Sequence, residues 1–216
     1  MESPIVEEYL EAIYKLQASG KQPGPTDLGK ALAVSPPSAM EMMNRLEEKG
    51  LAARGKQKGI ILTRRGEREA LRLIRKHRIS ERFLVDILGM DWKDAHDEAC
   101  KFEHVLSQDV ESRMEAMLKN PGTCPHGQPI PDKDGNTVEE RQRPLSSLAR
   151  GESGIVAKVA EEKREFLEYL TGMGMMPGRT VCVEQIAPFD GPLLIRIDGQ
   201  SHALDRDIAQ KIWIKG

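Results

Sequence analysis

The chain has 216 residues, which allows one large domain or two to three small ones. Charged residues make up 31% and hydrophobic residues 39%, as in a globular protein, and three unclustered cysteines argue against a disulfide framework. The sequence shows neither a signal peptide nor an apolar run of the roughly 18 residues that span a bilayer. These features favour a cytoplasmic protein without a membrane partner.

The N-terminal part of the chain has the pattern of a winged helix-turn-helix. Apolar residues at helical spacing predict helices over residues 3–17, 25–33 and 37–49, the last two joined by a short turn. Residues 51–63 read as two short extended pieces around a glycine-bounded basic tip, which is typical of a β-hairpin. A helix-turn-helix alone is weak evidence, but with a basic hairpin it favours DNA binding.

The charge of the chain, −2 in total, is unevenly distributed. The stretch from Arg45 to Arg82 holds 13 Lys and Arg against 5 Asp and Glu, whereas Asp86 to Glu115 holds 3 against 9. The first stretch suits a polyanion and the second suits cations. Taken alone, either stretch is also explained by ordinary solvated helix faces.

The nine residues from His96 to His104 suggest a metal site. No Pro or Gly interrupts them, so we expect a helix. At roughly 100° per residue, His96, Cys100, Glu103 and His104 fall on one side of it. Imidazole, thiolate and carboxylate are ligands of divalent transition metals. A single such residue is usually a solvated or satisfied polar group, and it is the set of four that favours a metal.

Further helices are expected on both sides of this stretch. A long helix from residue 63 or 64 to 88 carries His77 and Glu81 one turn apart, and another helix covers 108–119. Two helices with such pairs can enclose two neighbouring metal sites. The apolar stripe of this section fits either an internal core or a dimer face.

The rest of the chain changes character twice. Residues 121–144 are rich in Pro and Gly and read as a linker or an extended ordered arm. Cys124 and His126 are assigned no role there, because a lone Cys-x-His is usually without function. A small β-barrel is then expected. Its strands are predicted over 154–159, 180–186, 193–198 and 212–214, with a helix over 165–173.

Together these features resemble the diphtheria-toxin-repressor family of iron- or manganese-dependent regulators. The likeness is carried by the winged helix, residues 76–82, His96 to His104, residues 125–131 and the β-rich tail, and it spans nearly the whole chain. It implies an α+β fold. The implied domains are an N-terminal winged helix-turn-helix (1–64), a central all-helical metal-binding and dimerisation domain (65–120), a linker (121–144) and a C-terminal SH3-like β-barrel (145–216) similar to ferrous-iron-transport accessory proteins.

The resemblance also implies two metal sites. The primary set is Glu8, Cys100, Glu103 and His104; the ancillary set is His77, Glu81, His96, Glu162 and Glu165, with Glu11 as a reserve ligand. The iron branch of the family commonly has a thioether at the position of Glu8 and the manganese branch a carboxylate, so Glu8 favours manganese while Cys100 favours iron. Fe(II) is the expected cofactor and Mn(II) the second choice, with Co(II), Ni(II) or Zn(II) as substitutes in vitro.

The implied function is metal-dependent repression of metal-uptake genes by a homodimer on double-stranded, palindromic operator DNA, without enzymatic activity or a small-molecule substrate. The residues expected at DNA bases are Ser35, Pro37, Ser38 and Glu41, and those expected at phosphates are Thr26, Arg45, Arg54 and Lys56. Two alternatives are a winged-helix regulator that senses an organic ligand and a metal-dependent hydrolase. The hydrolase needs a further acid/base motif, which the sequence does not show.

Overall fold

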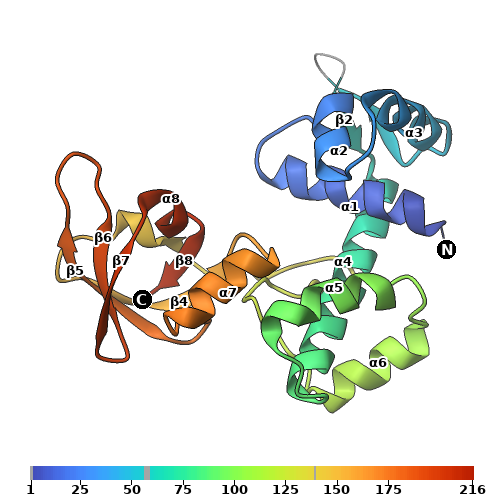
Figure 1. Ribbon diagram of the computed structural model, residues 1–216. Coiled ribbons are helices and arrows are strands. Elements are labelled where there is room, and N and C mark those ends of the chain that lie inside the picture. Colours follow the sequence, from blue (N-terminus) through green and yellow to red (C-terminus); the bar gives the residue numbers. More distant parts are fainter. Residues whose placement is uncertain (1, 56–58, 139) are drawn as a thin grey trace. The chain divides into compact units, whose positions relative to one another are not determined.

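The computed structural model describes residues 2–55, 59–138 and 140–216 (Figure 1). They divide into two compact units, Met1–His77 with Pro131–Asn136, and Arg78–Ile130 with Thr137–Gly216. The long helix α4 (Arg64–Asp86) begins in the first unit and ends in the second. None of the helices in the described part of the chain is long and apolar enough to cross a membrane.

The first unit contains the expected winged helix-turn-helix. Its elements are α1 (Pro4–Ala18), α2 (Pro25–Ala31), α3 (Pro36–Glu48), β1 (Ala52–Arg54) and β2 (Ile60–Leu62). Each of the three helices starts with a proline, whose fixed φ suits the first helical turn, and β1 pairs with β2 in an antiparallel hairpin. Lys56, in the tip of this hairpin, lies outside the described residues.

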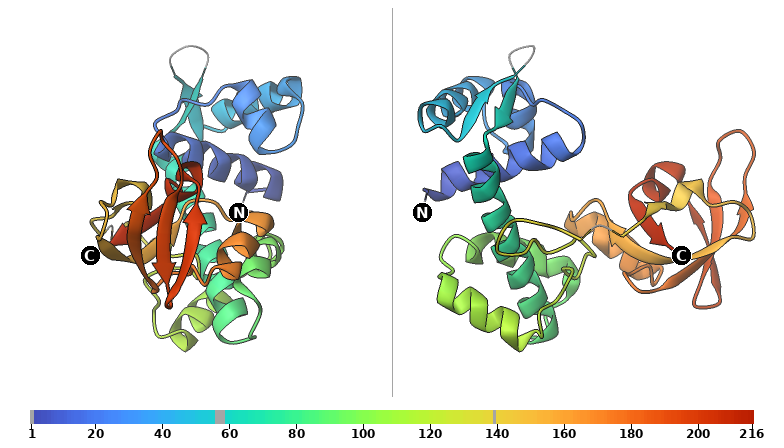
Figure 2. Two further views of the ribbon diagram at one scale, coloured as in Figure 1. Left: turned by 60° about the vertical axis from the view of Figure 1, so that its left-hand side comes forward. Right: turned by 180° about the vertical axis from the view of Figure 1, so that it is seen from behind.

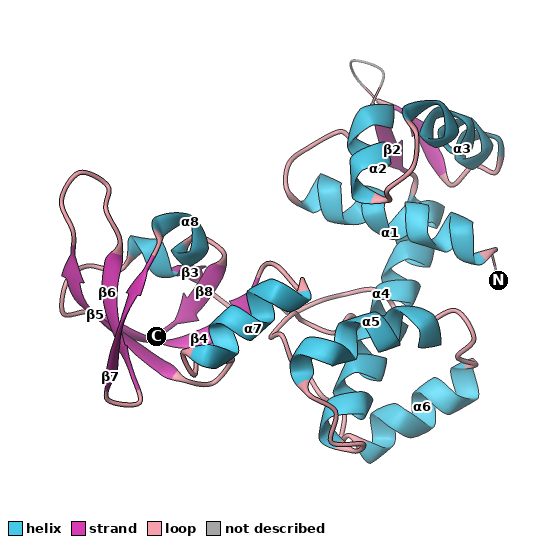
Figure 3. Cartoon of the chain, viewed as in Figure 1, coloured by secondary structure: helices cyan, strands magenta, loops and turns pink. Residues whose placement is uncertain are grey.

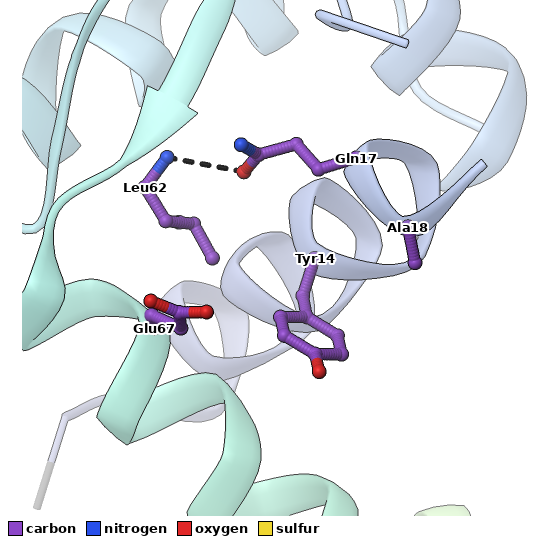
Figure 4. Close-up of a pocket in the computed structure, with 5 residues that line it drawn as sticks. All are labelled: Tyr14, Gln17, Ala18, Leu62 and Glu67. Carbon is purple, nitrogen blue, oxygen red and sulfur yellow. Dashed lines mark hydrogen bonds between the residues drawn. The ribbon is translucent and has the colours of Figure 1, made fainter. Parts of the chain in front are cut away.

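One hydrogen bond ties the first helix to the wing. The Leu62 N–H of β2 donates to the side-chain oxygen of Gln17, 3.1 Å away (Figure 4). Beside it is a pocket of about 300 Å³, lined by Tyr14, Gln17, Ala18, Leu62 and Glu67. Below these contacts, Leu10, Met43 and Ile60 are fully buried in one core, which holds α1, α3 and the wing together.

The second unit begins with the end of α4, followed by α5 (Trp92–Phe102) and α6 (Gln108–Met117). Asp91 and Ser107 cap α5 and α6 by accepting hydrogen bonds from backbone N–H groups. The expectation of one helix over residues 96–104 was wrong at its end. Because α5 stops at Phe102, Glu103 is its C-cap and His104 lies in the following turn.

The C-terminal part of the second unit is a six-stranded antiparallel sheet (Figures 2 and 3). The strands are β3 (Arg143–Pro144), β4 (Ser153–Val159), β5 (Thr180–Ile186), β6 (Leu193–Ile197), β7 (Gln200–Leu204) and β8 (Ile212–Lys215), in the order β3-β8-β4-β5-β6-β7. The short helices are η2 (Leu145–Ser147), α7 (Arg164–Gly172) and α8 (Arg206–Ala209). The SH3-like fold is confirmed, although the edge strands β3 and β7 do not pair in the described part of the chain.

Candidate metal centre and DNA-binding surface

The segment expected to be a linker or an extended ordered arm contains a tight turn at residues 124–127. The Cys124 N–H donates to Gln128 O and the Gly127 N–H to Cys124 O, both at 2.9 Å. On one side the Val159 N–H of β4 donates to His126 O at 3.0 Å. These bonds fix Cys124 and His126 in place and bury both side chains.

Arginines of α4 hold the two flanks of this turn. Arg82 donates to Thr123 O at 3.0 Å, and Arg78 donates to Pro129 O. In the first unit, Arg75 donates to Pro131 O at 2.6 Å. Part of the basic stretch, which the charge pattern associated with a polyanion, therefore binds backbone carbonyls of the chain itself.

Gly127 is required by the turn in two ways. Its φ is +83°, and a Cβ added there lies 2.0 Å from Ala157 O. We expect Gly127→Ala to lower the free energy of unfolding by about 3 kcal/mol, because it combines left-handed strain with a backbone clash. Gly122→Ala is the matched control, since Gly122 has no atom within 4 Å of its added Cβ. Equal urea midpoints for the two variants contradict this prediction.

Four side chains converge at the turn. Ligand atoms of Glu81, Cys124, His126 and Glu162 all lie within 4.8 Å of one another. His126 Nδ1 is 3.3 Å from Glu81 Oε1, 3.9 Å from Glu162 Oε1 and 3.9 Å from Cys124 Sγ. Glu81 comes from α4, and Glu162 from the connection between β4 and α7. We name these four residues the buried cluster.

The tautomer of His126 follows from its second nitrogen. Nε2 lies 2.9 Å from the carbonyl oxygen of Trp92, and a carbonyl only accepts, so Nε2 carries the hydrogen. In the neutral ring, Nδ1 then presents its lone pair to the thiol and the carboxylates. An imidazole whose far N–H bonds a backbone carbonyl is the usual arrangement of a metal-binding histidine. The donor set of one nitrogen, one sulfur and two carboxylates fits a divalent transition metal.

Burial and charge shift the pKa values in the buried cluster. Burial, helped by the charges of Glu81 and Glu162, raises the pKa of the Cys124 thiol well above its usual value. Burial opposes protonation of His126, but its hydrogen bond to Glu81 and the two negative charges outweigh that effect and raise its pKa. In the metal-free protein, Cys124 and His126 therefore hold their protons more strongly than usual.

The ancillary set is partly assembled next to the buried cluster. His96 Nδ1 lies 3.1 Å from Glu81 Oε1 and 3.3 Å from Glu162 Oε2, so Glu81 and Glu162 face both histidines. His77 is buried on α4, one turn before Glu81 and at the end of the first unit. Glu165 is exposed on α7, and within the described ranges it joins no group of three or more close ligand atoms.

The members of the primary set are distributed differently. Buried Glu103 has Oε1 3.5 Å from His104 Nε2, whereas the exposed Cys100 has Sγ 3.9 Å from His96 Nε2. Glu8 is exposed on α1, and Glu11 pairs with Lys15 at 3.0 Å. Because both glutamates belong to the first unit, the complete primary set stays a prediction.

The residues expected to contact DNA lie at the surface of the first unit. Ser35 caps α3, with its oxygen 2.8 Å from Ser38 Oγ. The other exposed members of the set are Thr26 on α2 and Pro37, Glu41 and Arg45 on α3. Arg54 is also exposed, but its guanidinium bonds α3: Nε donates to Glu47 Oε2 at 2.8 Å. Their roles at DNA stay predictions.

Family models match three consecutive parts of the chain. Residues 1–60 match "Iron dependent repressor, N-terminal DNA binding domain", and residues 63–132 match "Iron dependent repressor, metal binding and dimerisation domain". Residues 143–216 match the FeoA domain. All three kinds of domain that the sequence resemblance implied are therefore present.

Whole-length relatives agree with these matches. The iron-dependent repressor IdeR of Mycobacterium leprae is 30% identical over 97% of this chain and 96% of its own. Among solved structures, a manganese-dependent transcriptional repressor in complex with manganese has a TM-score of 0.88 and 32% identity, covering 97% of this chain and 98% of that one. ScaR with bound Cd²⁺ has a TM-score of 0.84 and 32% identity, over 97% and 98%.

Proposed function

This chain belongs to the iron-dependent repressor family, and we propose that it is a metal-dependent transcriptional repressor acting in the cytoplasm. As a homodimer with bound metal, it binds palindromic operator DNA and represses metal-uptake genes. The winged helix-turn-helix supports the DNA contact, because its α3 exposes a row of polar side chains suited to a major groove. The buried cluster supports the metal dependence.

The observation that carries the proposal is the arrangement around His126. Glu81, Cys124, His126 and Glu162 are the residues that would hold an ion, which supplies positive charge where their ligand atoms crowd together. Trp92 O orients the His126 ring, and the arginine-held turn orients Cys124. A second ion is proposed, by resemblance, for Glu8 with Cys100, Glu103 and His104, and His77 is proposed to add to the ligands around Glu81.

The preferred metal follows from the ligands. A buried thiolate favours Fe(II) and other softer ions over Mn(II), whereas the carboxylates Glu81, Glu162 and Glu8 favour Mn(II). We rank Fe(II) first and Mn(II) second, with Co(II), Ni(II) and Zn(II) as substitutes in vitro. Cys124 adds to the argument for iron, which rested on Cys100 alone in the sequence.

The buried cluster joins segments that are distant in the sequence. Glu81 lies on the helix that begins at the winged domain, and Glu162 lies in the SH3-like domain. When ligands on two such segments bind the same metal ion, the segments can no longer move independently. If the arrangement of the protein that binds DNA also binds metal more tightly than the other arrangements do, metal raises the population of the DNA-binding arrangement. The size of this shift is set by the difference between the two metal affinities.

The helical part of the second unit supports the homodimer. Several large apolar side chains are exposed there: Ile87, Leu88, Phe102, Val105, Val110 and Met117. Val105 is 77% exposed, and such exposed apolar surface is typical of a protein–protein interface. The family model over this region is described as a dimerisation domain.

The proposal is tested by DNA binding under anaerobic conditions. Genomic fragments are incubated with the full chain and Fe(II), Mn(II), Zn(II) or a chelator, and bound fragments are sequenced. We expect recovery of palindromic sites near metal-uptake genes with Fe(II) or Mn(II), and their loss with chelator. If the same DNA fragments are recovered with chelator, the protein is instead a regulator that responds to a non-metal ligand. Metal-dependent hydrolysis that survives removal of residues 1–60 indicates an enzyme.

A further inference from the structure

The guanidinium of Arg54, on the wing strand β1, contacts the middle and the C-terminal end of α3. Nε donates to Glu47 Oε2 at 2.8 Å, one terminal nitrogen lies 3.6 Å from Met40 Sδ, and the other donates to Asn44 Oδ1. All the partners belong to α3 and to the same compact unit. The guanidinium is therefore occupied on the helix that presents side chains to DNA.

Asn44 is exposed on this helix, three residues after Glu41 and therefore on the same face. Its amide orientation is determined by Arg54. A guanidinium has only donors, so the amide group that faces it must be the oxygen, because the NH₂ group has no acceptor to offer. The NH₂ group of Asn44 is consequently the end of the amide away from Arg54, and within the described parts of the chain it makes no hydrogen bond.

This orientation decides which base edge Asn44 matches in the major groove. An asparagine with both amide ends available pairs with adenine, accepting from N6 and donating to N7. Arg54 already uses one of the two lone pairs of the Asn44 oxygen, so the NH₂ group is the freer end of the amide. Guanine offers this group two acceptors, N7 and O6, at the same edge. Adenine offers the NH₂ group only one acceptor, N7, beside the N6 donor, and cytosine offers a donor alone.

We propose that Asn44 is a base-reading residue that selects guanine over adenine, and that Arg54 is the positioning residue that sets this choice. Glu47 completes the arrangement, because its bond to Arg54 Nε keeps the guanidinium on α3 instead of leaving it for a DNA phosphate. This inference rests on the proposed repressor function and adds one determinant of operator sequence. It also replaces the phosphate contact that the sequence assigned to Arg54.

The test is in vitro selection from a random duplex library with the full-length, Mn(II)-loaded chain. We expect Asn44→Ala to flatten one position of each half-site, and the wild type to favour guanine over adenine there at least about fivefold. We expect Arg54→Ala to shift that position toward adenine, since the released amide oxygen can accept from N6. Glu48→Ala, an exposed neighbour on α3, is expected to keep the wild-type preference.

Arg54→Lys is a second variant, used in case Arg54→Ala disturbs the fold of the wing. Lysine keeps the positive charge but lacks the planar guanidinium that bonds Glu47 and Asn44 at the same time. The same adenine shift is expected for it. Unchanged preference in both Arg54 variants overturns the inference. The inference is also overturned if the Arg54 variants lose the same DNA affinity for every sequence and the slope of log affinity against log salt concentration falls by about one. Those two changes are the signature of a lost phosphate contact. A wild type that enriches no metal-dependent site overturns the proposed function as well.

Discussion

His126→Ala is expected to weaken metal binding by at least about 100-fold and to remove the effect of metal on DNA binding. Loss of an outer partner of a metal ligand already costs roughly 10- to 100-fold in affinity, and His126 is the only nitrogen ligand of the buried cluster. Without the imidazole, one thiol and two carboxylates remain, a set with weaker preference for iron. Competition with a fluorescent chelator measures the affinity, and fluorescence anisotropy of a labelled operator measures the response.

His202→Ala is the matched control, because His202 is a partly exposed histidine on β7 of the same unit. It should retain the wild-type metal affinity and metal response. Cys124→Ser should behave like His126→Ala in direction, since an alcohol does not replace a thiolate ligand. If His126→Ala still responds to metal like the wild type, the buried cluster is not the regulatory site.

The elements of the fold were largely predictable where local patterns are strong. Helices α1 to α3 begin at prolines and carry apolar stripes, and β6 alternates buried Leu193, Ile195 and Ile197 with outward residues. Strand β7 was not expected, because only its last residue, Leu204, is buried and the rest is polar or exposed. A strand of this kind is specified by its pairing with β6, which local patterns do not contain.

The candidate site was predictable only in part, because it depends on contacts between distant segments. The stripe from His96 to His104 required one uninterrupted helix, but the chain leaves the helix at Phe102. Cys124 and His126 were set aside as a linker pair, since their meaning comes from Glu81 and Glu162. The signal that was available was the turn itself: a Gly directly after Cys-x-His allows a tight turn that places both side chains on one side.

Metal affinity is expected to fall steeply as the pH is lowered. Binding needs a Cys124 thiolate and a neutral His126, and the pKa values of both groups are raised. Above the raised pKa of His126 one proton, from the Cys124 thiol, is displaced for each ion, so affinity drops about tenfold per pH unit. Below the raised pKa of His126 a second proton is displaced, and the drop approaches about 100-fold per unit. Isothermal titration in buffers of different ionisation enthalpy counts these protons.

Lowering the pH weakens metal binding but stabilises the metal-free protein. The contribution of His126 to metal binding can therefore be separated from its contribution to the stability of the fold. Because its folded pKa is raised, protonated His126 beside Glu81 stabilises the metal-free fold below the ordinary pKa of histidine, and that stability is lost as the pH rises through the raised value. The stability conferred by metal instead disappears as the pH falls. Cys124→Ser should lower the proton count above the raised pKa of His126 by about one. A proton count of zero at every pH rules out binding through the Cys124 thiolate and the His126 imidazole.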